Sequence, residues 1–597
     1  MAIALAIAVP SSALAETRYV AKGGSDTTAC TGAGVPCLTV TYAVGQAVDG
    51  DTIDIGPGTY AESINTPKIL TFVGRGGGSI GGAPGTTTVR GPDGVKADGA
   101  AAFVLPNGGT LRTLRAQGGN GGSEVLTFGH GGGDGVRYDS SSAAASTLRL
   151  EAVVVLGGNG GSGTGNDPFE RGTAGTGIDV RSDPGPVRLS AADSEFAAGT
   201  GLGNGIAVWV DGPTAAADIT DSVVPDVEYY GPAMAIFDGA QVQLEATDLY
   251  EDIAFFHGSL SISRSRLSAD GVPFYLDASE TDTAQAEIRN SLIVSRQTHA
   301  IEVSTAEEAS VLVTIHGSTV IGHGEAAVVA EREDEALRPP AVVLQNSIAR
   351  HLPPAGLPIP PADLLAIGGT ISADFSSFTT AVSENGGTVT APGSGGNVAG
   401  DPLLVDEANG VYVPSGVSPL IDRGDPSIVQ VGELDLVGAP RSLDGNLDCL
   451  IAPDIGAYEL TGRSAPCPPA DAAPVVSRFG ITNRVFAPKG KRPRRAAASA
   501  RRGKKLKRGT KFTYTLSEPA RVSITIERKT KRRKKVRWVK QTILRASEKA
   551  GRQSTAFNGR AKGRALKAGR YRARIVATDQ AGQASNPRQV AFRVVRG

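Results

Sequence analysis

The 597-residue chain has little of what most enzymes and most large hydrophobic cores are built from. It contains 6 His, 4 Cys, 2 Met and 2 Trp, and aromatic residues make up 5% of it. Its His residues are scattered, and no Ser-His-Asp order, nucleophile elbow or phosphate-binding loop stands out, which argues against the corresponding enzyme classes. After the amino end no stretch of about 20 apolar residues occurs, so we expect no membrane span.

Glycine and proline, by contrast, are abundant at 78 and 36 residues, which suits many tight turns and a narrow core. A short phrase with Ser or Thr between apolar residues recurs between residues 190 and 350, at intervals of about 18 to 29 residues. A period of this length without an amphipathic helix predicts a solenoid of strands. The recurring hydroxyl residues are Ser194, Ser222, Thr247, Ser265, Ser291, Ser318 and Ser347.

Each copy of the phrase alternates apolar and polar residues, so one face of a short strand points inward. A second series runs in phase with the first, through Asp211, Asp238, Asp277, Ser304 and Glu331. Two or more strands per period predict an all-β chain built on a right-handed single-stranded parallel β-helix, whose turns stack about 4.8 Å apart. We expect the recurring Ser and Thr residues to form a hydrogen-bonded column rather than a row of nucleophiles.

The amino end has the features of an export signal. Residues 1–15 contain an apolar run and end in the small-residue cleavage site Ala13–Ala15. The positively charged leader is missing, which we attribute to a start placed too late, and an ordinary apolar strand is the alternative. Four cysteines fit an exported chain, although they allow three pairings, and their spacing does not suit zinc. The natural disulfide pairs are Cys30 with Cys37 and Cys449 with Cys467.

Two segments carry a resemblance to known families. The run Tyr19–Asp26, Pro36–Cys37, Gly50–Ile53 and Gly58–Tyr60 resembles the opening turn of secreted bacterial pectin-lyase-like β-helix proteins, where a short helix covers the open end. Residues 400–460 are similar to the choice-of-anchor Q domain, on the motifs Ser418–Gly424, Gly438–Arg441 and Asp454–Glu459. The resemblance implies that this segment closes the β-helix just before an attachment module.

Candidate sites on the β-helix are few. Asp211 and Asp238 are expected at one register on neighbouring turns, where their carboxylates would lie near 5 Å, the separation that retaining glycosidases use. Each precedes a glycine, which is also an ordinary turn signal. The loop Gly118–Ser123 recurs as Gly157–Ser162, and each is followed by acidic or amide residues, Asp134 or Asn166–Asp167. We interpret these as stacked loops without a metal or other cofactor, with calcium turns as the alternative.

Charge separates the two ends of the chain. The residues from Pro474 onward carry 37 Lys and Arg against 4 acids, so the remainder is 33 units negative although the total is zero. Alternating segments after residue 509 predict a β-sandwich, and Gly569–Tyr571 with Ala577–Gly582 looks like the closing strands of bacterial Ig-like surface modules. The residues expected to bind polyanions are Arg494, Arg495, Arg501, Arg502, Lys504, Lys505, Arg532, Arg533, Lys534 and Lys535.

The sequence therefore predicts an exported, cell-surface protein in which the β-helix binds carbohydrate or a partner. The basic module is expected to hold it to an anionic envelope polymer or polysaccharide, without specific nucleic-acid recognition. A polysaccharide lyase or glycoside hydrolase is the alternative, so enzyme activity stays open. The predicted parts are a signal peptide at 1–15, a β-helix at 16–460 ending in the choice-of-anchor Q-like segment, a Pro-rich and basic linker at 461–508 and an Ig-like sandwich at 509–597.

Overall fold

The structure is a computed structural model. It describes residues 14–76, 86–123, 130–140, 142–161, 173–201, 205–225, 232–279, 281–333, 336–352, 362–462, 473–490, 506–532 and 535–596. The chain divides into two compact units, Met1–Ala465 and Pro466–Gly597. Nearly all of the predicted signal peptide lies outside the described residues. None of the helices in the described ranges has the length and apolar character needed to cross a membrane.

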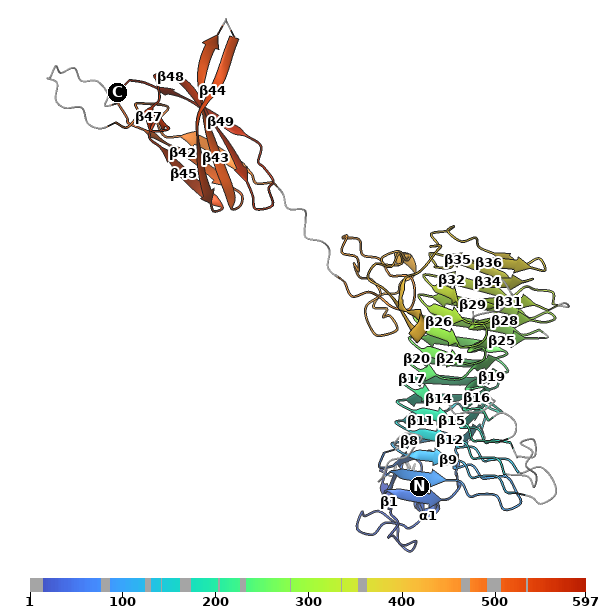
Figure 1. Ribbon diagram of the computed structural model, residues 1–597. Helices are drawn as coiled ribbons and strands as arrows, with labels where there is room; N and C mark the ends of the chain where they lie inside the picture. The colour runs from blue at the N-terminus through green and yellow to red at the C-terminus, as the bar shows by residue number, and fades with distance from the viewer. Residues whose placement is uncertain are drawn as a thin grey trace, which may run out of the picture. The chain divides into compact units, whose positions relative to one another are not determined.

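The first unit is a coil of parallel strands, which stack on their equivalents in neighbouring turns to form three long sheets (Figure 1). Sheet A consists, in stacking order, of β1 (Thr17–Val20), β2 (Thr52–Ile55), β5 (Thr71–Val73), β8 (Gly108–Arg112), β11 (Ser146–Glu151), β14 (Val187–Ala192), β17 (Ala215–Thr220), β20 (Ala240–Glu245), β23 (Gly258–Ser263), β26 (Thr283–Arg289), β29 (Ser310–His316), β32 (Ala341–Gln345), β35 (Thr370–Asp374) and β37 (Thr388–Val389).

The other two sheets complete each turn. Sheet B consists of β3 (Gly58–Ala61), β6 (Thr87–Arg90), β9 (Arg115–Gln117), β12 (Val154–Leu156), β15 (Glu195–Ala197), β18 (Val223–Val224), β21 (Asp248–Leu249), β24 (Arg266–Ala269), β27 (Leu292–Ser295), β30 (Thr319–Gly322) and β33 (Ile348–His351). Sheet C consists of β4 (Ile64–Asn65), β7 (Phe103–Val104), β10 (Val136–Asp139), β13 (Ile178–Arg181), β16 (Val208–Asp211), β19 (Met234–Phe237), β22 (Ile253–Phe255), β25 (Phe274–Ala278), β28 (Ile301–Thr305), β31 (Ala326–Arg332), β34 (Ala362–Ile367) and β36 (Ala381–Glu384). The predicted right-handed parallel β-helix is confirmed.

Alternation in each strand produces this arrangement, because every second side chain enters the coil. The inward positions of one sheet A register are all apolar and nearly inaccessible to solvent. Stacking these positions turn upon turn gives one continuous core, which no single turn could form. Running through the stack, this register contains Leu148, Leu189, Ala217, Val242, Leu260, Ala286, Val313, Val342 and Ile371.

The recurring hydroxyl residues lie at the bend between sheets A and B. The Ser265 N–H donates to the Ser291 Oγ at 3.2 Å, and the Ser291 N–H donates to the Ser318 Oγ at 3.1 Å. Each Oγ also donates to a carbonyl two residues earlier, as Ser291 does to Arg289 at 2.7 Å. The preceding residue takes a left-handed conformation, with φ of 49° at Asn290, and this turns the chain sharply. The predicted hydrogen-bonded column is confirmed.

A short helix covers the first turn, as the opening motif predicts. Helix α1 (Val40–Gln46) begins at Thr39, whose side chain accepts from the Tyr42 N–H, and it packs Val40, Ala43 and Val44 into the core. Two charged side chains complement the helix ends. Glu62 accepts from the N–H groups of Val40 and Thr41, whereas the Lys68 Nζ donates to the carbonyls of Val44, Gly45 and Ala47. These contacts satisfy backbone groups that every helix leaves unpaired.

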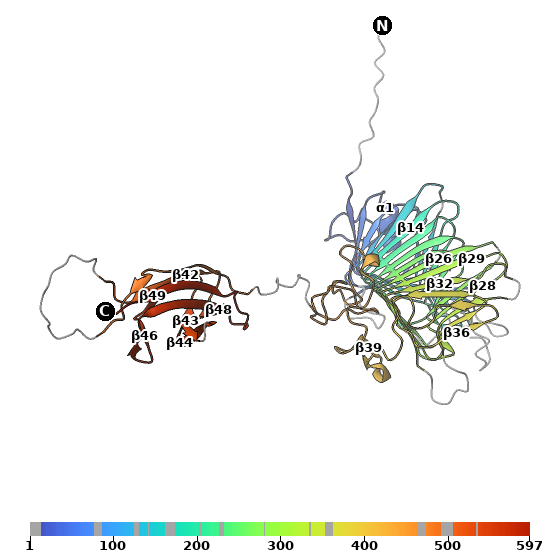
Figure 2. The same cartoon turned by 90° about the horizontal axis from the view of Figure 1, so that it is seen from above.

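Residues 404–460 cover the outer side of the later turns rather than stacking on the last one. They contain β38 (Leu404–Asp406), η2 (Glu407–Asn409), β39 (Val411–Pro414) and η3 (Pro426–Ile428), and the view from above places β39 outside the coil (Figure 2). Tyr412, Leu436 and Ala457 cluster with Leu292 and Ile321 of sheet B. An apolar outward face of sheet B is thereby removed from water.

The second unit is a sandwich of two mainly antiparallel sheets with a small hairpin. One sheet contains β40 (Val476–Ile481), β42 (Thr510–Leu516) and β45 (Gly551–Phe557). The other contains β41 (Val485–Phe486), β49 (Arg588–Val594), β48 (Gly569–Thr578), β43 (Ala520–Arg532) and β44 (Lys535–Glu548), and the hairpin is β46 (Arg560–Ala561) with β47 (Arg564–Ala565). Stacked rings of Phe486, Phe512, Phe557 and Phe592 form the core between them.

The predicted boundary of this unit requires correction. β40 and β41 lie inside the segment 461–508 that was expected to be a linker, and they pair with β42 and β49. The predicted boundary is wrong because the long basic run at 489–508 resembles a flexible linker in composition, although two strands precede it. The structure instead places the first two strands of the sandwich ahead of that run.

Loss of one hydroxyl from the Ser column should destabilise the first unit. In Ser291→Ala, the buried Ser265 N–H loses its acceptor, so the free energy of unfolding should fall by about 1–3 kcal/mol. Ser259→Ala on the exposed side of β23 serves as the control and should change it by less than about 0.5 kcal/mol. Urea denaturation followed by circular dichroism measures both, and equal losses would contradict the structural role of the column.

Candidate functional site

The outward face of sheet C carries a strip of charged and aromatic side chains. β10 presents Arg137 and Asp139, and β13 presents Asp179 and Arg181 at the same registers with the charges exchanged. On the next turn Trp209 lies opposite Asp179, and Asp211 lies opposite Arg181. Alternation directs all of these side chains away from the core, because their neighbours at 136, 138, 178, 180, 208 and 210 are buried in it.

Ion pairs within single turns and one cation–π contact between turns hold the strip together. Asp134 pairs with Arg137 at 2.6 Å, and Asp179 pairs with Arg181 at 2.8 Å. The Arg181 guanidinium lies 5.4 Å from the centre of the Trp209 ring. These contacts hold the charged groups and the indole in a single arrangement before any ligand arrives.

Three aromatic rings continue the strip. Trp209 stacks on Phe237 with ring centres 4.6 Å apart, and Phe237 stacks on Phe256 at 4.8 Å. All three rings are partly exposed, and the equivalent positions beside them carry the small residues Ala235 and Ala254. We call Asp139, Asp179, Arg181, Trp209, Asp211, Phe237 and Phe256 the outer strip.

A second polar group lies beyond the rings on the same face. The Tyr275 hydroxyl donates to Asp277 at 3.4 Å, and the Ser304 hydroxyl donates to the same carboxylate at 2.7 Å. Burial raises the pKa of the Glu302 carboxyl, which His299 opposes, and raises the pKa of Tyr275 to about 12, to which Asp277 and Glu302 add. The face therefore presents aromatic rings bordered at both ends by hydrogen-bonding groups.

The expected pairing of Asp211 with Asp238 is wrong. The residue opposite Asp211 on the next turn is Phe237, and Asp238 follows β19 in an exposed turn with φ of 47°. The register differs by one residue, and because side chains alternate along a strand, that shift moves Asp238 out of the row. Asp211 instead accepts a hydrogen bond from the Trp209 Nε1 at 3.4 Å and belongs to the outer strip.

Asp179 is the most perturbed acid of the strip. Burial raises its pKa from 3.8 to about 6, and this exceeds the opposing effect of the Arg181 hydrogen bond, while nearby Asp134 and Asp139 raise it further. Burial likewise raises the pKa of Asp139, and one of its carboxylate oxygens has no hydrogen-bond partner among the described residues. The strip thus contains a carboxylic acid that keeps its proton up to mildly acidic pH.

Because Asp179 binds its proton more tightly in the folded chain, its contribution to stability is present below pH 3.8 and is lost as pH rises through about 6. As pH rises from about 4 to 7, this group should lower the free energy of unfolding of the wild type by about 2–3 kcal/mol. Asp179→Asn should remove that part of the pH dependence, whereas Asp238→Asn should keep it. Urea midpoints between pH 4 and 7 measure this, and identical profiles for wild type and Asp179→Asn would contradict it.

Glycine-rich loops stack beside the outer strip, between sheets B and C. The N–H groups of Gly133, Gly158, Gly175 and Gly199 donate to the carbonyls of Gly119, Gly133, Gly158 and Gly175, alternately within one loop and between the loops of successive turns. Gly158 must be glycine, because a Cβ there would lie 1.9 Å from the Gly119 oxygen. The two repeated Asn residues continue the stacking through their side chains: the Asn159 N–H donates to Asn120, and the Thr200 N–H to Asn159.

The calcium alternative for these loops gains no support from Asp134. Its carboxylate pairs with Arg137 and accepts from the Thr176 N–H at 3.1 Å, so it serves to join loop and strand. Asn166 and Asp167 lie outside the described residues. Stacking of the loops, as the sequence indicates, is observed.

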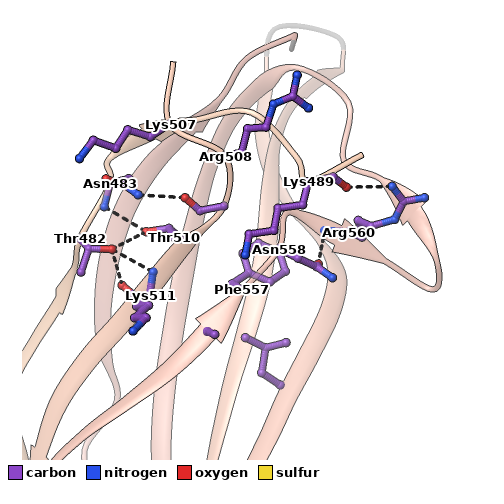
Figure 3. Close-up of a pocket in the computed structure, with 13 residues that line it drawn as sticks. Thr482, Asn483, Lys489, Lys507, Arg508, Thr510, Lys511, Phe557, Asn558 and Arg560 are labelled. Atoms are coloured by element: carbon purple, nitrogen blue, oxygen red, sulfur yellow. Dashed lines mark hydrogen bonds between the residues drawn. The ribbon is translucent and has the colours of Figure 1, made fainter. Parts of the chain in front are cut away.

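The second unit has a basic pocket of about 800 Å³ (Figure 3). The chain preceding β42 meets the turn that follows β45 there, and Thr482 and Asn483 hydrogen-bond to Thr510 and fix one wall. Among the residues that the structure describes, its lining contains five cations and no acid. Arg560 is held by the carbonyls of Lys489 and Gly563. The five cations are Lys489, Lys507, Arg508, Lys511 and Arg560.

Most of the residues expected to bind polyanions lie outside the part of the chain that the structure describes. Arg494, Arg495, Arg501, Arg502, Lys504, Lys505, Arg533 and Lys534 lie outside the described residues, Arg532 ends β43, and Lys535 is exposed at the start of β44. Of the cysteines, Cys30 and Cys37 form the expected disulfide. Cys449 is also disulfide-bonded, and Cys467 lies outside the described residues.

Comparison with known proteins gives structural neighbours only. No protein-family model and no curated sequence matches the chain. Similar solved structures include a pectate lyase Pel9A, with 12% identity, a TM-score of 0.36 and coverage of 75% of this chain and 96% of the other. A rhamnogalacturonan lyase has 13% identity, a TM-score of 0.28 and coverage of 57% and 83%.

A third neighbour is the tailspike gp49 of the Acinetobacter baumannii bacteriophage Fri1, a capsular polysaccharide depolymerase. It has 9% identity, a TM-score of 0.24 and coverage of 98% of this chain and 78% of the other. At such identities and scores, no ligand or reaction is transferred to this chain. The stacked sheets themselves define the first unit as a right-handed parallel β-helix.

Sequence reasoning missed the larger part of the outer strip. It included Asp211 but not Asp179, Arg181 or Trp209 as members of one site. The alternation in Ile178–Arg181 and Val208–Asp211 is visible in the sequence, and aligning these two segments would have placed the residues side by side. The Gly-rich loop between β12 and β13 conceals the repeat, because it makes the interval from Val136 to Ile178 longer than the interval from Ile178 to Val208.

Proposed function

We propose that this protein is an exported carbohydrate-binding scaffold whose outer strip binds a glycan. The stack of Trp209, Phe237 and Phe256 carries this proposal. Aromatic rings offer flat apolar area at little cost in side-chain entropy, and charged and amide groups around them give hydrogen bonds that orient a polar ligand. Carboxylates and guanidinium groups at one end, with Tyr275 and Asp277 at the other, suit a ligand rich in hydroxyl groups.

The extended shape of the strip supports a chain-like ligand. Its members come from successive turns of one sheet, so they repeat at the strand spacing of about 4.8 Å along the coil. A ligand that follows the coil axis would contact several turns at once. Each contact would be weak, but contacts on a single rigid scaffold add without an ordering cost for each turn.

The basic pocket supports attachment through the second unit. Five cations converge without an acid in the lining, and like charges at this density favour a polyanion that releases counterions on binding. The binding partner that fits is an anionic polysaccharide or envelope polymer at the surface of the producing cell. Export through residues 1–15 would bring the chain to that surface.

Removal of the indole should weaken glycan binding. Trp209→Ala deletes the ring that contacts both Arg181 and Phe237, and the dissociation constant should rise by about tenfold or more. Trp538→Ala is the matched control, because it removes the chain's other Trp from the second unit. Isothermal titration against a panel of neutral and acidic oligosaccharides measures the effect, and equal behaviour of the two variants would contradict the proposed site.

Neutralising the basic pocket should weaken retention on an anionic polymer. The variant Arg508→Gln with Lys511→Gln should reduce the magnitude of the negative slope of log affinity against log salt by about 2. Each lost contact means that about one counterion fewer is released on binding. Lys549→Gln with Arg588→Gln removes two exposed cations elsewhere in the unit and should have a smaller effect. Polygalacturonate-coated sensors read at several salt concentrations measure this. Wild-type retention that is independent of salt would contradict the electrostatic account.

Glycan cleavage is the second candidate, because Asp179 is a buried acid with a pKa near 6 beside other carboxylates. Such a group is suited to donate a proton to a leaving oxygen. Cleavage would appear as new reducing or unsaturated ends when the protein acts on acidic polysaccharides. Asp179→Asn should abolish these products and retain binding, and wild-type protein that binds without releasing products would exclude this candidate.

A further inference from the structure

Three carboxylates converge in residues 404–460, which we call the lateral segment. They lie away from both sites already described. Asp422 follows β39, and Asp444 and Asp448 lie in the loop before the Cys449 disulfide. The three side chains each place one oxygen within 4.8 Å of the oxygens of the other two. Two segments that are separated by 22 residues along the chain are thus joined at a point of high negative charge.

One carboxylate oxygen of this cluster is buried without a hydrogen-bond partner among the described residues. Asp444 is 1% exposed, and its Oδ2 accepts from the Cys449 N–H at 3.2 Å. Its Oδ1 is fully covered and has no hydrogen-bond partner in the described part of the chain. A buried carboxylate oxygen without a donor costs free energy, because water has been removed and nothing replaces it.

Positive side chains do not compensate these charges within the described residues. No Lys or Arg there forms an ion pair with Asp422, Asp444 or Asp448, and the nearby Arg441 is directed to Glu459 and to the carbonyls of Asp454 and Gly456. Backbone N–H groups of Gly445 and Asn446 orient Asp422 but do not neutralise it. Three acids facing one another need a counter-charge.

The spacing of the loop residues identifies a suitable counter-ion. Asp444, Asn446 and Asp448 are oxygen-bearing side chains at alternate positions, as at positions 1, 3 and 5 of calcium loops. The three acids offer only oxygen ligands. Zinc and copper prefer nitrogen and sulfur ligands, so this site does not suit them. Calcium accepts irregular sets of oxygen ligands, whereas magnesium demands a near-ideal octahedron, so calcium is the ion of choice for such a loop.

We propose that Asp422, Asp444 and Asp448 bind one calcium ion. The ion would satisfy the buried Asp444 Oδ1 and join the bend at Asp422 to the loop 444–449. It would therefore stabilise the lateral segment at the end of the first unit, next to the start of the connection to the second. Affinity typical of extracellular modules, with a dissociation constant on the order of 10⁻⁴–10⁻³ M, is expected.

Calcium titration of the full chain tests the proposal. With chelator-treated protein, calorimetry should show one site per chain, and calcium should raise the unfolding temperature of the first unit. Asp448→Asn is exposed and suited to the first test, and Asp444→Asn removes the buried charge but keeps an acceptor for the Cys449 N–H. Each variant should weaken calcium binding by about tenfold or more. Asp401→Asn, just before this segment and outside the cluster, should bind as the wild type does.

Three outcomes would overturn the proposal. The first is wild-type protein that shows neither binding nor a thermal shift in millimolar calcium. In the second, calcium binds Asp448→Asn and Asp444→Asn as tightly as the wild type, which would locate the ion elsewhere. In the third, magnesium gives the same shift as calcium, which would indicate screening of negative charge. Circular dichroism in chelator confirms that each variant is folded before it is titrated.

Discussion

The structure depends on the fixed register between neighbouring parallel strands. Each turn pairs with the next residue by residue, so an apolar column such as Leu189, Ala217 and Val242 continues through the coil. The same constraint acts on the outside, where it brings Asp179, Arg181 and Trp209 together from turns that are remote in sequence. Core and outer strip are therefore two faces of one alignment, and a shift of one residue would exchange them.

The regularity of the sequence repeat explains how much of the fold and of the outer strip could be predicted from the sequence. The Ser column was predictable because Ser265, Ser291 and Ser318 recur with apolar neighbours at nearly equal intervals. The pairing of Asp211 with Asp238 failed because the intervals vary, and an error of one residue is invisible in a list of spacings but decisive in a strand. Basic composition likewise marked the second unit but not its first strands, β40 and β41, since two short strands leave little periodic signal.

The sites proposed here differ in what positions them. Rigid strands position the outer strip, so its rings are stacked and its ions paired in the absence of a ligand. The basic pocket is built from segments at the end of a sandwich, and most of its cations are exposed. The first arrangement favours discrimination between ligands, whereas the second favours attraction to any dense negative charge.

The direction of the Ser column has a consequence for how such a protein changes in evolution. Along most of the column the N–H donates to the hydroxyl of the following turn, as Ser318 does to Ser347 and Ser347 to Ser376, and Ser376 donates to the side-chain oxygen of Asn397. Each of these turns thus presents a backbone N–H donor to one neighbouring turn and a hydroxyl acceptor to the other. A gene segment encoding one whole turn could be duplicated or lost while these junctions remain intact. The length of the outward face of sheet C could then change in steps of one turn.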